Sequence, residues 1–262
     1  MQRFELILHR GHNLDHVENS VAGIADIRAL AGDIRIEIDI NVTRDGHAVL
    51  FHDHSLDRLC GVSGIISDIA YADLPSLPDG SAIPKLKDIL EMFPNQGFIL
   101  DLRDDAHPDL FTGSVLGPGD LRSDIATAVH ARLRDALDPS HASHVRIWSG
   151  SLEQRHKLST LFPDFEVDIA ERYCRDFLGD FQNGSATDFL GPDPRRVYIR
   201  LREITAGMAQ RFHDAGLLVV ATTSYFSRSL ENSARALQEA RNVGADGLIV
   251  SPVSPRILKD LL

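Results

Sequence analysis

Three carboxylate side chains stand within runs that should otherwise be wholly apolar. In the run Ile34–Asn41, Glu37 and Asp39 are two residues apart, so both point from the same face of a strand. Asp101 interrupts the apolar run Phe98–Arg103 in the same way. Carboxylates that meet in an apolar setting raise one another's pKa or bind a cation. Oxygen ligands without cysteine favour Mg²⁺ or Ca²⁺, so the pattern predicts a site for one divalent metal.

Histidine and arginine side chains end neighbouring strands beside these acids. His9 and Arg10 close the first apolar run, and His52 closes a short run that follows the second. Two imidazoles beside one acidic cluster suit a general acid and a general base, because imidazole titrates near neutral pH. With a divalent cation and two arginines, Arg10 and Arg103, the site would carry about one positive charge, which a phosphodiester would neutralise. The alternative is that the acids form salt bridges with Arg10, Arg35 or Arg103.

The elements that must position these residues alternate along the chain. Eight short runs rich in Ile, Val and Leu are typical of parallel strands covered by helices: Glu5–His9, Ile34–Asn41, Phe98–Arg103, Val145–Ser149, Phe165–Ala170, Val197–Leu201, Leu217–Thr222 and Gly247–Ser251. Helical patterns lie at Glu18–Ala31, Lys85–Phe93, Leu121–Leu137, Leu152–Phe162, Ile204–Ala215, Leu230–Val243 and Pro255–Leu262. Eight such units over about 250 residues predict an α/β protein with a (β/α)₈ TIM barrel. An open doubly wound sheet is the alternative, and the lack of a glycine-rich dinucleotide or phosphate loop after any strand weakens it.

One domain is expected over residues 1–262, with a small insertion after the second strand at about residues 53–82. This segment is rich in Gly, Ser and Asp and departs from the strict alternation. Because it follows a barrel strand, it should lie at the carboxyl end of the barrel, where active sites are built.

Charge and composition exclude several classes of protein. The chain has 27 Lys and Arg against 38 Asp and Glu, a formal net charge of −11. Such an acidic chain without a basic run is not expected to bind nucleic acid. It has no apolar stretch of roughly 18 residues to span a membrane. With no secretory signal and only two cysteines, Cys60 and Cys174, a cytoplasmic location is expected, and homo-oligomerisation is left open.

Taken in order, these residues resemble the glycerophosphodiester phosphodiesterase family. The similarity is strongest over the first 90 residues or so and rests on His9-Arg10-Gly11, Glu18-Asn19-Ser20, Glu37-Ile38-Asp39, Thr43-Arg44-Asp45-Gly46, His52-Asp53, Leu56-Asp57-Arg58 and Ile83-Pro84-Lys85-Leu86, with Gly244–Ile249 as a closing strand. The resemblance implies a (β/α)₈ barrel and a phosphoric diester hydrolase of lipid and glycerol metabolism. The implied reaction is metal-dependent hydrolysis of a small-molecule glycerophosphodiester to glycerol 3-phosphate and an alcohol.

The resemblance also implies a role for each site residue. It makes His9 and His52 the acid–base pair, Arg10 a phosphate-binding residue, and Glu37 and Asp39 metal ligands. Asp101 stands where the family usually has a glutamate as the third ligand, and Arg103 where it usually has a phosphate-binding lysine. These departures keep three alternatives open: a specialised sugar or lipid phosphodiester as the substrate, a catalytically silent phosphate-binding barrel, and another metal-assisted barrel enzyme such as a phosphatase or lyase.

Overall fold

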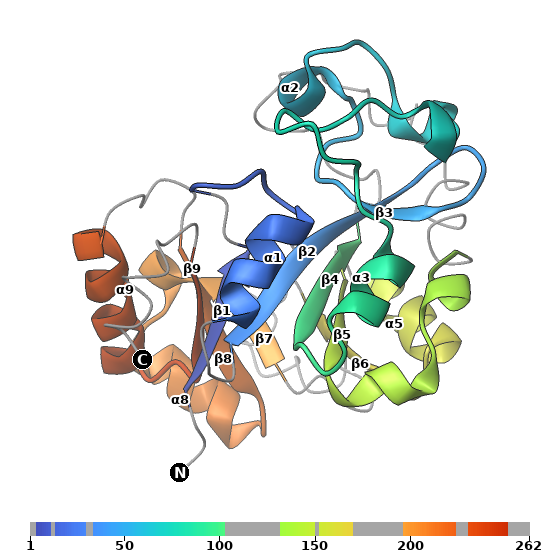
Figure 1. Cartoon of the computed structure of the whole chain (residues 1–262). Coiled ribbons are helices and arrows are strands. Elements are labelled where there is room, and N and C mark those ends of the chain that lie inside the picture. Colours follow the sequence, from blue (N-terminus) through green and yellow to red (C-terminus); the bar gives the residue numbers. More distant parts are fainter. Residues whose placement is uncertain are drawn as a thin grey trace.

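Eight parallel strands close into a barrel (Figure 1). The computed structural model describes residues 4–11, 14–29, 34–102, 132–149, 152–169, 196–223 and 230–250. The barrel strands are β1 (Glu5–His9), β2 (Ile34–Val42), β4 (Phe98–Leu102), β5 (Val145–Ser149), β6 (Glu166–Ile169), β7 (Arg196–Arg200), β8 (Leu218–Thr222) and β9 (Gly247–Val250). Each pairs in parallel with the next, and β9 pairs with β1. The predicted TIM barrel is confirmed, and the open doubly wound sheet is wrong because β1 has a partner on both sides.

Helices cover the outside of the barrel (Figure 1). They are α1 (Val21–Arg28), α3 (Leu86–Met92), α5 (Leu152–Leu161), α8 (Ala206–Asp214) and α9 (Leu230–Asn242), with 3-10 turns η3 (Pro139–Ser143) and η5 (Leu201–Glu203). Residues 132–136 are also helical. Ile36, Ile38 and Ile40 of β2 are fully buried in the large hydrophobic cluster that joins the strands to these helices. The opposite face of β2 therefore points its polar residues into the barrel.

The first helix begins three residues later than the sequence predicts. The Ser20 side chain accepts a hydrogen bond of 3.1 Å from the Gly23 amide, so Ser20 caps the helix and Glu18 lies in the preceding turn. Asn19 has a φ of 57° there, which ends any helical path through Glu18. Glu18 and Asn19 therefore lie in the turn before α1. From there their side chains reach Arg10 and Asp39 at the carboxyl end of the barrel.

A short hairpin leads from β2 into the segment expected as an insertion. Strand β3 (Ala48–Leu50) pairs antiparallel with the end of β2. The chain then forms α2 (Asp57–Cys60), η1 (Ile66–Asp68) and η2 (Tyr71–Asp73), which lie beyond the end of the barrel at the top of Figure 1. A separate hydrophobic cluster stabilises this segment, formed by Val49, Phe51, Leu56, Ile66, Leu77 and Ile83. The division of the whole chain into domains stays a prediction.

Several sequence predictions fall outside the described residues. These are Arg103, the helix Pro255–Leu262 and most of the helix Leu121–Leu137. Among the helices that the structure describes, none combines the length and the apolar character needed to cross a lipid bilayer.

The amino end of the barrel interior is filled by a network of ion pairs. Glu5 accepts hydrogen bonds from Arg146 at 2.7 and 2.9 Å and from Arg35 at 2.8 Å, and Arg146 and Arg196 both contact Glu166. Burial alone would raise the pKa of Glu5, but the hydrogen bond and charge of Arg146 lower it. Arg35 is therefore used to pair with Glu5, and the alternative that it neutralises the acids of the second strand is wrong.

Above this layer lies an apolar one. Ile7, Ile99, Tyr198, Val220 and Ile249 form a buried cluster inside the barrel, with Trp148 packed against it. This cluster is the floor on which the polar residues of the carboxyl end stand.

Candidate active site

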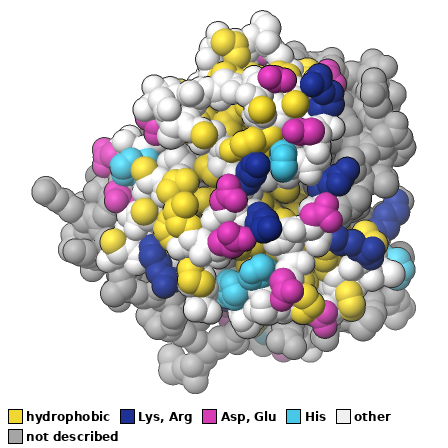
Figure 2. Space-filling model, turned by 45° about the vertical axis from the view of Figure 1, so that its right-hand side comes forward, with side chains coloured by type: hydrophobic (Ala, Val, Ile, Leu, Met, Phe, Trp, Pro, Cys, Tyr) yellow, Lys and Arg dark blue, Asp and Glu magenta, His cyan; other side chains and the backbone are white. Residues whose placement is uncertain are grey.

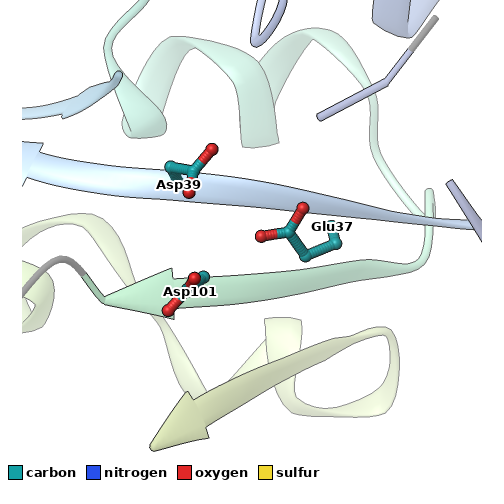
Figure 3. Close-up of side chains that lie close together, drawn as sticks. All are labelled: Glu37, Asp39 and Asp101. Atoms are coloured by element: carbon teal, nitrogen blue, oxygen red, sulfur yellow. The ribbon is translucent and has the colours of Figure 1, made fainter. Parts of the chain in front are cut away.

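The three carboxylates predicted from the strand pattern meet at one point inside the barrel. Strands β2 and β4 pair so that Asp39 lies opposite Asp101, and Glu37 lies one strand repeat below on the same face. Ligand oxygens of all three residues lie within 4.8 Å of one another, and Figure 3 shows them facing each other across the two strands. Glu37 and Asp39 are buried, at 0% and 1% exposed. This geometry could hold a metal ion.

The charge of this cluster fits a divalent cation. Burial raises the pKa of Glu37 well above its ordinary value, and the neighbouring charges of Asp39 and Asp101 raise it further, while Arg10 opposes them. Within the described part of the chain, one oxygen of Glu37, Oε1, is buried without a hydrogen-bond partner. Counted over the same residues, three carboxylates against the guanidinium of Arg10 leave two negative charges. An oxygen-only donor set with that charge suits Mg²⁺ or Ca²⁺.

Arg10 is fixed beside the carboxylates by an unusual backbone. Its φ of 59° is left-handed, and Gly11 follows with a φ of 74°. The Arg10 amide donates to the backbone oxygen of Glu37 at 2.8 Å and to its carboxylate at 3.1 Å. The Arg10 side chain lies 3.2 Å from Asp39 through Nε and 3.1 Å from Glu18 through Nη1. Left-handed geometry at a residue other than glycine costs on the order of 1 kcal/mol, and here it turns the guanidinium back over the end of β2.

The two predicted histidines lie at the end of β1 and shortly after β3. His9 ends β1, and its Nε2 lies 3.8 Å from the carboxylate of Glu37. His52 follows β3 and is 6% exposed; its Nδ1 is hydrogen-bonded to the Asp53 carboxylate. The amide of Asn41 holds this turn, donating to the backbone oxygens of Phe51 and Asp53 at 2.8 and 3.1 Å. The end of β2 thereby positions His52.

An ion-pair chain connects His52 to Arg10. The second oxygen of Asp53 accepts a hydrogen bond from Nε of Arg58, whose Nη1 donates to Glu18 at 3.2 Å. Burial alone would raise the pKa of Asp53, but the hydrogen bonds of His52 and Arg58 hold it well below its usual range. Asp53 is therefore a carboxylate that only accepts hydrogen bonds. We call His52, Asp53, Arg58, Glu18 and Arg10 the ion-pair chain.

The floor beneath the cluster contains a buried acid and the single tryptophan. In the register of the sheet, Asp101 lies opposite Trp148, and Trp148 lies opposite Asp168. Tyr198 donates a hydrogen bond of 2.8 Å to Asp168, and its ring centroid lies 4.9 Å from that of Trp148, with the ring planes tilted by 52°. Burial and the charge of Glu166 raise the pKa of Asp168 to about 6.

Sequence reasoning located most of this site and missed the roles of two asparagines. His9, Arg10, Glu37, Asp39, Asp101 and His52 are all brought to the carboxyl end of the barrel, while Arg103 lies outside the described residues. Asn19 donates a hydrogen bond of 2.8 Å to Asp39. Asn41 lies two residues beyond Asp39 on the same strand face, so the period of the strand could have found it. The contact of Asn19 carries no such signal, since it depends on the turn before α1.

Charges of both signs are mixed on the face of the molecule drawn in Figure 2. Figure 2 shows basic, acidic and histidine side chains interspersed among hydrophobic ones on the described part of that face. The acidic excess of the sequence is therefore not gathered there into one patch.

Comparisons with known proteins point to one family. Residues 9–103 match the model of the glycerophosphoryl diester phosphodiesterase family. A glycerophosphodiester phosphodiesterase from Caldanaerobacter subterraneus is 28% identical over 123 residues, which cover 44% of this chain and 48% of that protein. A lysophospholipase D from Homo sapiens is 31% identical over 119 residues, covering 39% of this chain and 38% of that protein. The chain thus spans about half, or less, of the length of these curated relatives.

Solved structures extend the likeness to the whole fold. A glycerophosphodiester phosphodiesterase from Thermotoga maritima has a TM-score of 0.69 at 16% identity, covering 100% of both chains. A phosphodiesterase from Oleispira antarctica, solved in complex with the product sn-glycerol-3-phosphate, has a TM-score of 0.68 at 19% identity, covering 97% of this chain and 95% of that one. At these identities the likeness establishes the shared barrel.

Proposed function

We propose that the chain, whose residues 9–103 match the model of the glycerophosphoryl diester phosphodiesterase family, belongs to that family and hydrolyses a glycerophosphodiester to glycerol 3-phosphate and an alcohol. The observation that carries this proposal is the convergence of Glu37, Asp39 and Asp101 at one point, with His9 and Arg10 ending the adjacent strand. The product we propose is also the one bound in the Oleispira antarctica phosphodiesterase. We propose the cytoplasm as its compartment.

The acidic cluster would hold one Mg²⁺ or Ca²⁺ ion. Glu37, Asp39 and Asp101 are its ligands in this proposal, and Oε1 of Glu37, which has no hydrogen-bond partner among the residues that the structure describes, supports a cation there. When bound, the ion would orient the attacking hydroxyl and stabilise charge on the phosphoryl oxygens. Asn19 and Arg10 would keep Asp39 aligned, since both already contact its Oδ2.

His9 and His52 would move the protons. One imidazole takes the proton of the glycerol 2-hydroxyl as its oxygen bonds to phosphorus, and the other protonates the departing alcohol oxygen as its bond to phosphorus breaks. Water then opens the cyclic phosphate, with the two histidines exchanging roles. Arg10 and Arg103 would bind the phosphate; in the structure Arg10 is already fixed over the end of β2 by its contact with Asp39.

A lipid diester is a second candidate for the substrate. The similarity to a lysophospholipase D favours it over other specialised diesters. A lysophospholipid carries the same glycerophosphodiester, so the same residues would act on it.

Metal-dependent product formation tests the proposal. Protein stripped with EDTA would be incubated with glycerophosphocholine or lysophosphatidylcholine, alone and with Mg²⁺ or Ca²⁺ restored, and the products followed by ³¹P NMR. We expect glycerol 3-phosphate from the first substrate, or lysophosphatidic acid from the second, only after a metal is restored. Metal binding without turnover of either diester would instead favour the silent phosphate-binding barrel.

A further inference from the structure

The carboxylate of Glu18 is shared between two arginines from distant parts of the chain. It accepts a hydrogen bond of 3.1 Å from Arg10, which follows β1, and two from Arg58, which lies in α2 beyond the hairpin; the one from Nη1 of Arg58 measures 3.2 Å. Glu18 and Arg58 are 40 residues apart in sequence. Neither residue has a part in the reaction proposed above, although both belong to the motifs of the first 90 residues or so.

Each of the two arginines contacts a different part of the site. Arg58 holds the Asp53 carboxylate, whose other oxygen meets Nδ1 of His52. Arg10 lies 3.2 Å from Asp39 of the acidic cluster. Charge alternates along the ion-pair chain from Asp53 to Arg10. The Asp53 and Arg10 side chains at its ends are 1% and 8% exposed, and the middle of the chain is more exposed, at 31% for Arg58 and 13% for Glu18. In such a series of paired charges, each group limits the rotamers of the next.

The chain has a defined chemical consequence at His52. A carboxylate that only accepts hydrogen bonds requires a proton on the nitrogen it faces, so Asp53 places the proton of the neutral imidazole on Nδ1. The nitrogen that remains for proton transfer is then Nε2. Arg58 keeps Asp53 from rotating, because an arginine side chain can only donate hydrogen bonds and occupies the second carboxylate oxygen.

We propose that Glu18 is a positioning residue that sets the orientation and tautomer of His52 through Arg58 and Asp53, and the orientation of the Arg10 guanidinium directly. The kinetic part of this inference rests on the proposed function, whereas the tautomer part does not. Residues that hold reacting groups in place from outside the site typically change activity by about 10–100-fold when they are replaced.

The tautomer is tested without turnover. In metal-free protein with ¹⁵N-labelled histidine, two-dimensional NMR distinguishes Nδ1–H from Nε2–H, and the signals absent from His52→Ala identify His52. We expect Nδ1–H in the wild type at a pH where the imidazole is neutral. In Asp53→Asn, Arg58 should draw the amide oxygen, so the amide NH₂ faces His52 and the proton moves to Nε2. The same tautomer in both proteins overturns the inference.

The two branches of the chain are separated by kinetics. Arg58→Lys keeps the charge but loses the geometry that bridges Asp53 and Glu18, so we expect kcat to fall by about 10–100-fold with KM unchanged. Glu18→Gln weakens both branches, so we expect a similar fall in kcat together with a rise in KM for the diester. The matched control is Arg44→Lys, which alters an exposed arginine that contacts Asp68 and Asp73 outside the ion-pair chain.

The outcomes distinguish this inference from the proposed function. If the wild type hydrolyses the diester but Arg58→Lys and Glu18→Gln both match the Arg44→Lys control, the positioning role is refuted. If the wild type hydrolyses no diester, the proposed function fails, and the tautomer measurement alone decides the inference. Circular dichroism establishes folding; Arg58, at 31% side-chain exposure, is the milder site should Glu18→Gln fail to fold.

Discussion

Replacing Glu37 by glutamine should stabilise the metal-free protein and abolish its stabilisation by metal. Glu37 is fully buried and faces two carboxylates, with oxygens within 4.8 Å, and one guanidinium. At that distance one pair of like charges repels by about 3.5 kcal/mol at an effective dielectric of 20. Arg10 offsets about one such repulsion, so at least one remains in addition to the cost of burial. The amide of glutamine removes the charge and still offers an oxygen to the Arg10 amide.

Protonation limits the size of the effect. The folded protein can neutralise Glu37 by binding a proton, and at pH 7 that costs at most about 3.4 kcal/mol from an ordinary pKa of 4.5. We therefore expect Glu37→Gln to raise the free energy of unfolding of the metal-free protein by about 1–3 kcal/mol. For a domain of this size, that raises Tm by roughly 2–10 °C.

The pH dependence has a definite sign. A carboxyl whose pKa is raised by folding makes the folded state bind more protons, so its penalty is absent below pH ~4.5 and grows as the pH rises toward the folded pKa. The gain of Glu37→Gln over the wild type should therefore be larger at pH 8 than at pH 5.

Calorimetry with EDTA, and then with saturating Mg²⁺ or Ca²⁺, measures both effects. A bound ion stabilises the wild type by an amount that grows with the logarithm of the free ion concentration above its Kd, whereas Glu37→Gln should gain little. The control is Glu91→Gln on α3. The Glu91 side chain is 67% exposed, and its carboxylate lies 3.9 Å from Nζ of Lys87. The reasoning would be refuted if metal-free Glu37→Gln were less stable than the metal-free wild type and if added metal stabilised both proteins equally.

Three further predictions follow from the same geometry. His9→Ala and His52→Ala should each lower kcat by about 10²–10⁴-fold with unchanged circular dichroism, whereas the half-exposed His47→Ala should not; near-normal turnover in both would contradict their acid–base role. Metal titration should change the emission of Trp148, the only tryptophan, because it lies opposite Asp101, and should leave it unchanged in Glu37→Gln. Glu5→Gln should destabilise the protein by about 3–5 kcal/mol in urea while kcat of the folded protein is kept, because Arg35 and Arg146 lose the carboxylate that they share inside the barrel. Burial raises the pKa of Glu5, but the hydrogen bond of Arg146 and the charges of Arg146, Arg196 and Arg35 together lower it. The stability from these pairs is therefore present above pH ~4.5 and lost as the pH falls through the folded pKa, so wild type and Glu5→Gln should converge in acid.

Short-range regularities let the sequence determine much of this protein. Side chains alternate between the two faces of a strand, so the order of residues in Ile34–Asn41 already places Glu37 and Asp39 on one face, whatever the partner strands are. Parallel strands in a barrel bring their carboxyl ends to one rim, so residues ending several apolar runs had to converge. For these reasons the barrel and the acidic cluster were predictable, and the family motifs supplied the proposed roles of the histidines.

Only the tertiary structure decided which charges meet. Arg35 follows Ile34 at the start of β2, and sequence spacing could not tell whether it would neutralise Glu37 or pair with Glu5 on the neighbouring strand. The contact of Glu18 with Arg58 joins a turn before α1 to a helix beyond the β2–β3 hairpin. Such contacts depend on strand register and on the paths of two separate loops, which no local pattern encodes. Charged side chains act over a few ångströms, so the positioning of His52 was settled by packing rather than by composition.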